Sequence, residues 1–383
     1  MNNPTTRSDR LLDLLQSDPD NLRLLGDAAD TAFAEGRPEL AVELIDRYAG
    51  IAPPPPGLIN ILGLVALEQG RYGDAASVFQ SLHDSQADDA GLRFNLAWAR
   101  SRLGEFEAVL DLVSEDLAMA RSVAALLKIQ ALHHLGRLDE ALALGERVTE
   151  PHGDAADLMG ALASVAIDAE DVERARFWAQ RSAGAPEGQA TLGMLALAEG
   201  RMDEASQAFS AGLAVRSDSA RNLLGMGLVQ MRRGDMAAGA AALDQAAEVF
   251  VDHSGTWIAA GWAYFLAGDA ARAMTAFERA RDVDPAFGEA HGAIAVVQLL
   301  QGDVEDARRH AATARRLDKE TLGGALADLL LAQSEGRTEL ADRIREAALT
   351  MPVGPGGQTV AEALAQVATR PSASRTSERP ISD

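Results

Sequence analysis

The stretch Trp257-Ile258-Ala259-Ala260-Gly261-Trp262-Ala263-Tyr264 has a glycine in the middle of an apolar run, and Gly268 follows that glycine by seven residues. A glycine inside a helix costs about 1 kcal/mol relative to alanine, so Gly261 needs a packing reason. Gly268 fits the end of a helix, where a left-handed backbone conformation favours glycine. The stretch therefore predicts a helix that ends in a tight turn.

The turn glycine recurs along the chain, mostly at intervals of 34 residues. One member is missing between Gly136 and Gly200, and Glu170 stands in its place. Self-similarity at such a period is typical of a repeat architecture, and here it predicts ten helix–turn–helix units. The turn glycines are Gly36, Gly70, Gly104, Gly136, Gly200, Gly234, Gly268, Gly302 and Gly336.

Small residues recur at two further positions of the repeat. Five residues after the turn, nine of the ten units have Ala or Gly, as at Ala75 and Gly239. Seven residues before the turn, eight of the ten do, as at Gly63 and Gly227. We expect the two helices of a unit to approach closely at these two positions.

This pattern resembles the tetratricopeptide repeat family. The opening stretch, continued by Ala273, Phe277 and Pro285, matches the family pattern W-x2-L-G-x2-Y…A-x3-F…P, except that Ala260 replaces leucine. The resemblance covers roughly residues 22–350 and implies an all-α fold, a right-handed superhelical solenoid of antiparallel helix pairs. Residues 122–155 and 156–185 depart most from the pattern, with Lys128 and Ile129 at apolar or small positions.

Local signals divide the chain into five segments. The segment Ala183–Gly188 coincides with the shortest repeat interval, which predicts a boundary between two arrays. Thr359-Val360-Ala361-Glu362 is a capping box that opens a last helix, and the Ser, Arg and Pro content beyond it is typical of disorder. The expected segments are an N-terminal capping helix in 1–21, repeats 1–5 in 22–185, repeats 6–10 in 186–350, a C-terminal capping helix in 351–369 and a disordered tail in 370–383.

Composition excludes several classes of function. The chain has 383 residues, a net charge of −22 and no cysteine. The negative charge argues against nucleic-acid binding, and the lack of cysteine excludes disulfides and thiolate metal sites. The sequence has no long uncharged apolar stretch and no secretory signal at its start, so we expect no membrane insertion and a cytoplasmic location.

The residues that usually carry chemistry form no recognisable constellation. There is no phosphate-binding G-x-x-x-x-G-K-[ST] motif, and the adjacent His133 and His134 would point about 100° apart on a helix. We therefore expect no catalytic, cofactor or metal site and no enzymatic activity. One basic cluster has two interpretations, an exposed outer helix face or a docking point for an acidic partner; it comprises Arg308, Arg309, His310, Arg315, Arg316 and Lys319.

The resemblance implies that ligands lie along a concave groove lined by the first helix of each unit. Transferring the groove positions of the family onto this sequence gives a mostly apolar stripe. Exposed apolar stripes mark binding surfaces, but the same residues also fit an inter-repeat core, and the pattern leaves both open. The candidate partner-binding residues are Phe94, Trp98, Met194, Leu224, Leu228, Met231, Ile258, Trp262, Phe265, Val296 and Leu299.

These features predict a non-enzymatic scaffold or adaptor. It would hold an apolar or amphipathic segment of another protein in its groove. One alternative is a holding chaperone or assembly factor for secretion or envelope machinery. A second is the regulatory arm of a separate enzyme, and self-association through the stripe is a further use of the same surface.

Overall fold

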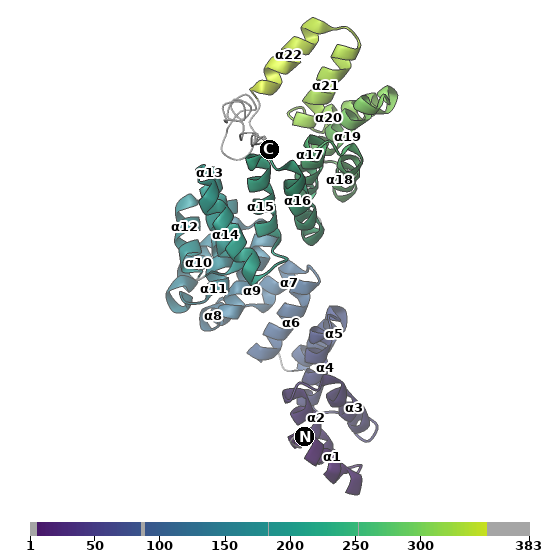
Figure 1. Ribbon diagram of the computed structural model, residues 1–383. Helices are drawn as coiled ribbons and strands as arrows, with labels where there is room; N and C mark the ends of the chain where they lie inside the picture. The colour runs from purple at the N-terminus through teal and green to yellow at the C-terminus, as the bar shows by residue number, and fades with distance from the viewer. Residues whose placement is uncertain (1–5, 86–88, 183, 252, 351–383) are drawn as a thin grey trace, which may run out of the picture. The chain divides into compact units, whose positions relative to one another are not determined.

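The structure is a computed structural model that describes residues 6–85, 89–182, 184–251 and 253–350. Within these residues the regular elements are α-helices, with no β-strand among them (Figure 1). The chain forms two compact units, Met1–Ala183 and Gly184–Asp383. In each unit, helices that follow one another along the chain pack as antiparallel pairs, and each pair packs on the next. The predicted fold class, an all-α helix-pair solenoid, is confirmed.

In its described residues, the first unit contains a leading helix, five helix pairs and one additional short helix. Its elements are α1 (Arg7–Ser17), α2 (Leu22–Ala34), α3 (Pro38–Ala49), α4 (Pro56–Glu68), α5 (Tyr72–Ser85), α6 (Ala90–Arg102), α7 (Phe106–Leu112), α8 (Glu115–Ala120), α9 (Ser122–His134), α10 (Leu138–His152), α11 (Ala156–Asp168) and α12 (Val172–Arg181).

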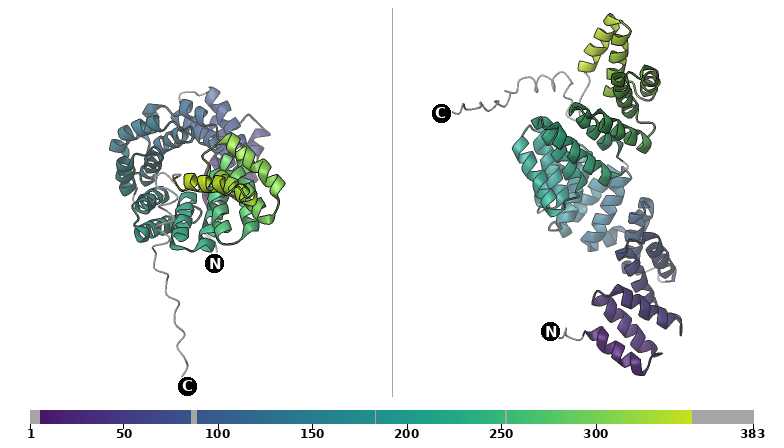
Figure 2. Two further views of the ribbon diagram at one scale, coloured as in Figure 1. Left: turned by 90° about the horizontal axis from the view of Figure 1, so that it is seen from above. Right: turned by 45° about the vertical axis from the view of Figure 1, so that its right-hand side comes forward.

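The second unit contains five helix pairs in its described residues, which Figure 2 shows from two further directions. Its elements are α13 (Pro186–Ala198), α14 (Met202–Val215), α15 (Ala220–Arg233), α16 (Met236–Phe250), α17 (Ser254–Leu266), α18 (Ala270–Val283), α19 (Gly288–Gln301), α20 (Val304–Leu317), α21 (Leu322–Ser334) and α22 (Thr338–Leu349).

The turns inside the helix pairs adopt the predicted left-handed conformation. All nine turn glycines have a positive φ, between 68° at Gly136 and 90° at Gly234. Glu170, the residue expected to replace the missing glycine, has a φ of 59°. The backbone geometry of the turn is therefore kept even where the glycine is absent.

The recurring mid-helix glycine makes room for a phenylalanine. A Cβ atom added to Gly63, Gly193 or Gly261 would lie 2.3–2.5 Å from the ring of Phe79, Phe209 or Phe277, respectively. Each ring belongs to the second helix of the same pair and is fully buried. The expected close approach of the two backbones is found in the α15–α16 pair instead. There a Cβ on Gly227 would lie 3.0 Å from the carbonyl oxygen of Gly239, and one on Gly239 would lie 3.1 Å from the carbonyl oxygen of Gly227.

The leading helix α1 is attached to the first pair by polar contacts at a turn. Glu35, next to the α2–α3 turn, accepts hydrogen bonds from the backbone N–H groups of Arg7 and Ser8 at 3.0–3.3 Å. Arg37 donates to Asp9 at 2.7 Å and to the hydroxyl of Ser8 at 2.7 Å. These contacts satisfy donors at the start of α1 that have no partner inside the helix.

The repeat is irregular between α6 and α9. The helix α7 ends at Leu112, and the short α8 follows before α9 begins. Lys128 on α9 donates hydrogen bonds to the backbone carbonyls of Leu110 and Val113. These carbonyls lie at the C-terminal end of α7, where the helix itself supplies no donors. The lysine at an apolar position thus caps a shortened helix. The expected C-terminal capping helix in 351–369 and the tail in 370–383 lie outside the described residues.

Candidate functional site

The first helices of the second unit carry a row of half-buried apolar side chains. These seven residues are neither fully buried nor fully exposed, and they pack on three cores of buried side chains in the unit. We call them the first-helix row; it consists of Met194, Leu224, Leu228, Met231, Trp262, Phe265 and Leu299.

Two of the predicted stripe residues in this unit lie deeper than the row. Val296 has no exposed surface, and Ile258 is 8% exposed. Both belong to clusters of buried residues. They support the row from beneath, so a ligand would contact their neighbours before reaching them.

Two strongly exposed leucines extend the row. Leu266 follows Phe265 and is 60% exposed, and Leu300 follows Leu299 and is 62% exposed. They lie 34 residues apart at the same position of the repeat, α17 ending at Leu266 and α19 one residue after Leu300. Sequence reasoning missed them because the family positions stop one residue earlier. The 34-residue recurrence of an apolar residue at this place was the available signal.

Trp262 is the largest side chain of the row, and its orientation is fixed on several sides. Its ring lies edge-on to Phe265 at 5.6 Å and to Phe277 at 5.1 Å between centroids. Its indole N–H donates to Oε1 of Glu289 at 3.1 Å. Aromatic pairs with this geometry contribute about 0.5–1.5 kcal/mol beyond the burial of their area.

Glu289 on α19 connects Trp262 to the start of the next first helix. Its carboxylate accepts the backbone N–H of Gly323, with distances of 3.1 Å to Oε1 and 3.0 Å to Oε2. Burial raises the pKa of Glu289 above its usual value, and the hydrogen bonds from Gly323 and Trp262 oppose that rise. One carboxylate therefore joins α17, α19 and α21.

The close approach of α19 and α21 makes this contact feasible. A Cβ on Gly292 would lie 2.2 Å from the backbone nitrogen of Gly324, and a Cβ on Gly323 would lie 2.6 Å from that of Ala293. The two helices meet backbone to backbone, because no side chain separates them at these glycines. Glycine at these positions thus brings the N-terminus of α21 within reach of Glu289.

The predicted residues in the first unit form a smaller aromatic patch on α6. Trp98 is 41% exposed and Phe94 is half-buried, with 6.1 Å between their ring centroids. The guanidinium of Arg121 lies 5.8 Å from the centre of the Phe94 ring. The patch offers an aromatic face beside a cation.

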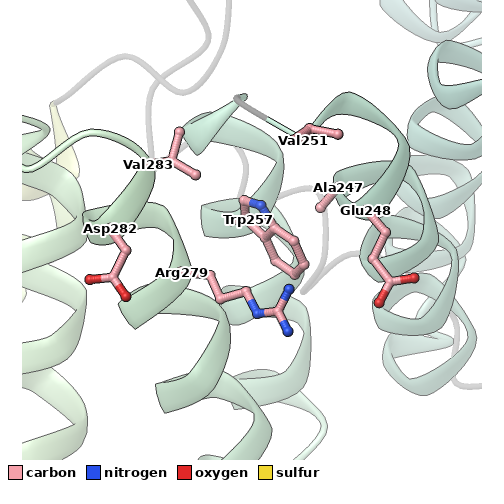
Figure 3. A pocket seen from close by; sticks show the side chains of 7 residues that line it. All are labelled: Ala247, Glu248, Val251, Trp257, Arg279, Asp282 and Val283. Carbon is pink, nitrogen blue, oxygen red and sulfur yellow. The ribbon is translucent and has the colours of Figure 1, made fainter. Parts of the chain in front are cut away.

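A pocket of about 520 Å³ lies among α16, α17 and α18 (Figure 3). Trp257 lies between Glu248 on α16 and Arg279 on α18, and the Arg279 guanidinium stacks 5.0 Å from the Trp257 ring. The sequence did not indicate this pocket, because Trp257 matches the family pattern and carried no further signal. A second pocket of about 470 Å³ is lined by residues of α20, α21 and α22 and the turn before α21, including Asp328 and Ile344.

Three of the six members of the basic cluster, which lies on α20 and just beyond it, are paired with carboxylates. Arg308 contacts Glu335 at 2.7 Å, Arg309 pairs with Asp306, and Arg315 pairs with Asp328. Five of its six members are exposed, His310 being half-buried. These contacts reduce the positive field that an acidic partner would meet.

The described histidines and carboxylates gather no metal site. No group of three or more such side chains in the described residues could hold a metal ion. His133 instead contacts Asp168 at 2.7 Å, and His134 stacks on Phe106 with 4.3 Å between ring centroids. Among the same residues, no helix has the length and apolar content that crossing a membrane requires.

Comparison with known proteins gives one family and several solved structures. The sequence model of the tetratricopeptide repeat matches residues 62–115, 191–252 and 258–320. The crystal structure of the APC/C hetero-tetramer Cut9–Hcn1 is similar with a TM-score of 0.57 and 16% identity, over 85% of this chain and 67% of that chain. PilF of Pseudomonas aeruginosa has a TM-score of 0.45 and 13% identity, over 55% of this chain and 96% of that one. No curated protein matches the sequence.

Proposed function

We propose that the second unit of this chain, which belongs to the tetratricopeptide repeat family, binds a segment of another protein along the first-helix row. The repeats of this family serve protein–protein interaction. The segment is apolar or amphipathic, and the protein acts as a scaffold or adaptor without chemistry of its own. The exposure of Leu266 and Leu300 beside the row is the observation that carries the proposal.

The two leucines beside the first-helix row offer apolar area that is still accessible to solvent. Burying a leucine side chain contributes about 1.5–3 kcal/mol, and Leu266 and Leu300 each retain more than half of their surface for a partner. Trp262 and Phe265 add aromatic edges whose positions are already fixed. Side chains that are ordered before binding lose little entropy on association, which favours affinity.

The negative net charge of the chain restricts the charge of the segments that it can bind. The chain carries a charge of −22, so an acidic segment would be repelled as it approached. An amphipathic segment whose polar side is neutral or basic fits this field. The aromatic patch of Phe94 and Trp98 is proposed as a separate contact in the first unit.

Site-specific photo-crosslinking tests the proposal. A benzophenone amino acid placed at Leu266 or at Leu300 in the full chain is expected to capture the same partner inside the cell. Val215, which is 67% exposed at the end of the second helix α14, provides the matched control. Equal capture from position 215, or no capture from positions 266 and 300, would refute the proposal.

Charge substitutions give an independent check. Leu266→Asp and Leu300→Asp should each weaken binding of the captured partner by about tenfold or more, since 1.4 kcal/mol corresponds to a factor of ten. Both side chains are exposed, so the fold should remain intact by circular dichroism. Val215→Asp adds the same charge elsewhere and should leave binding unchanged.

A holding chaperone remains the alternative use of the same row. An exposed apolar row shields an aggregating client without requiring one specific sequence. Light scattering of a chemically denatured model client, with and without one equivalent of the full chain, distinguishes the two. Suppression of aggregation that Leu266→Asp abolishes supports a chaperone, whereas unchanged aggregation excludes this alternative.

A cytoplasmic location of the protein stays a prediction.

A further inference from the structure

We infer that Glu289 is a positioning residue that holds Trp262 in its partner-binding orientation and couples that orientation to the docking of the last helix pair, α21–α22. The inference rests on the proposed function in one respect, namely that Trp262 contacts a partner. Its test, however, requires no partner, so the two can fail separately.

The geometry places Glu289 between two elements that do not follow one another in the chain. Oε1 accepts both the indole N–H of Trp262 from α17 and the backbone N–H of Gly323 from α21. Oε2 accepts the same Gly323 N–H at 3.0 Å. A carboxylate oxygen with two donors holds them in a fixed mutual arrangement, and bonds to an ionised acceptor are stronger than neutral ones.

The contact is specific to this part of the repeat array. Residues at the place of Glu289 in neighbouring units are Gly255 in α17 and Gly323 in α21, neither of which can reach a tryptophan. Trp257, five residues earlier in α17, has the guanidinium of Arg279 over its ring. The indole of Trp262 is thus held by a hydrogen bond that the repeat pattern does not require.

Two consequences follow for the energetics. If the indole N–H is withdrawn, the carboxylate keeps its desolvation penalty but loses one donor, so its ionised form moves toward solvent. The N–H of Gly323 then loses its acceptor at the first turn of α21, where helix donors have no intrahelical partner. We therefore expect that displacing Trp262 loosens the start of α21.

Hydrogen exchange measures the coupling in the full chain. Trp262→Phe keeps an aromatic ring and removes the indole N–H. We expect the amides at the start of α21 to exchange about tenfold faster in this variant, the order of effect of one charged hydrogen bond. Trp257→Phe is the matched control, a tryptophan in the same helix, and should leave these amides as in the wild type.

Fluorine NMR measures the other half of the coupling. The chain has four tryptophans, so labelling with 5-fluorotryptophan gives four signals, and Trp262→Phe identifies the one from Trp262. Glu289→Ala should shift that signal and leave the signal of Trp178, in the first unit, in place. Glu289→Gln, which retains one acceptor oxygen, should give an intermediate shift and intermediate exchange.

Three outcomes would overturn the inference. Unchanged exchange at the start of α21 in Trp262→Phe would show that the two elements are independent. Equal acceleration in Trp257→Phe would reduce the effect to general packing. An unmoved Trp262 signal in Glu289→Ala would show that the carboxylate does not set the orientation of the indole.

Discussion

Replacing Gly292 by alanine should destabilise the second unit, although alanine is the better helix former. A Cβ at this position would lie 2.2 Å from the backbone nitrogen of Gly324 and 2.5 Å from the carbonyl carbon of Gly323. Neither atom can rotate away, because both belong to the backbone of α21. Ordinary contact begins near 3.4 Å, so α19 and α21 must separate by about 1.2 Å.

The size of the effect follows from three contributions. Alanine gains about 1 kcal/mol of helix propensity. Overpacking a close contact costs about 1–3 kcal/mol, and the separation would stretch the hydrogen bond that the Gly323 N–H donates to the Glu289 carboxylate, which is worth about 1.5–3 kcal/mol. The net loss should be about 2–4 kcal/mol, which lowers the melting temperature of a unit of this size by about 5–15 °C.

Thermal unfolding of the full chain by circular dichroism measures this loss. Hydrogen exchange locates it, because repeat proteins can open one part at a time. Gly73→Ala is the control, since no neighbouring atom lies within 4 Å of its added Cβ, and it should not lower the unfolding free energy. A melting temperature of Gly292→Ala at or above that of the wild type would refute the reasoning.

Three further substitutions test other parts of the structure. Burial raises the pKa of Glu289, so the folded chain binds a proton at this carboxyl more tightly than the unfolded chain does. The unfolding free energy of the wild type, relative to that of Glu289→Gln, should therefore fall as pH rises from about 4.5. Chemical denaturation at several pH values measures this difference, and a difference that does not change with pH would contradict the prediction. Lys128→Ala should cost about 1–3 kcal/mol, because it leaves the Val113 carbonyl unsatisfied, whereas the exposed Lys319→Ala should change the unfolding free energy by less than about 0.5 kcal/mol. Phe277→Ala should cost about 3–5 kcal/mol, because the fully buried ring fills the space above Gly261, and a smaller loss in urea titration would show that the cavity collapses.

The fold could be predicted because its signals lie within single helix pairs. A turn that needs a left-handed residue restricts the sequence at one place in every repeat, and the spacing of Gly200, Gly234 and Gly268 reports it directly. Glu170 shows the limit of that signal, since only its place in the period identified it. The irregular α7 and α8 could not be predicted, because Lys128 acts there on carbonyls that are 15 and 18 residues away.

The candidate site was less predictable, because it depends on contacts between repeats. The family positions identified Trp262 but not Glu289, whose role arises only when α17, α19 and α21 come together. Glutamate is common in this acidic chain, so its identity carried no signal. The depth of Val296 also depends on its neighbours, since the same position in α17, Trp262, is only half-buried.

Because a phenylalanine packs on a glycine of the paired helix, the residue types at these two positions should change together in evolution. A chain that acquired alanine at position 63 would collide with the ring of Phe79, while loss of that ring alone would leave a void. A change at one position alone therefore costs stability, and a matching change at the other offsets that cost. The pair of Gly227 and Leu243 shows that a smaller partner is compatible with this architecture. Among homologues we expect the volumes at the two positions to be anticorrelated, repeat by repeat.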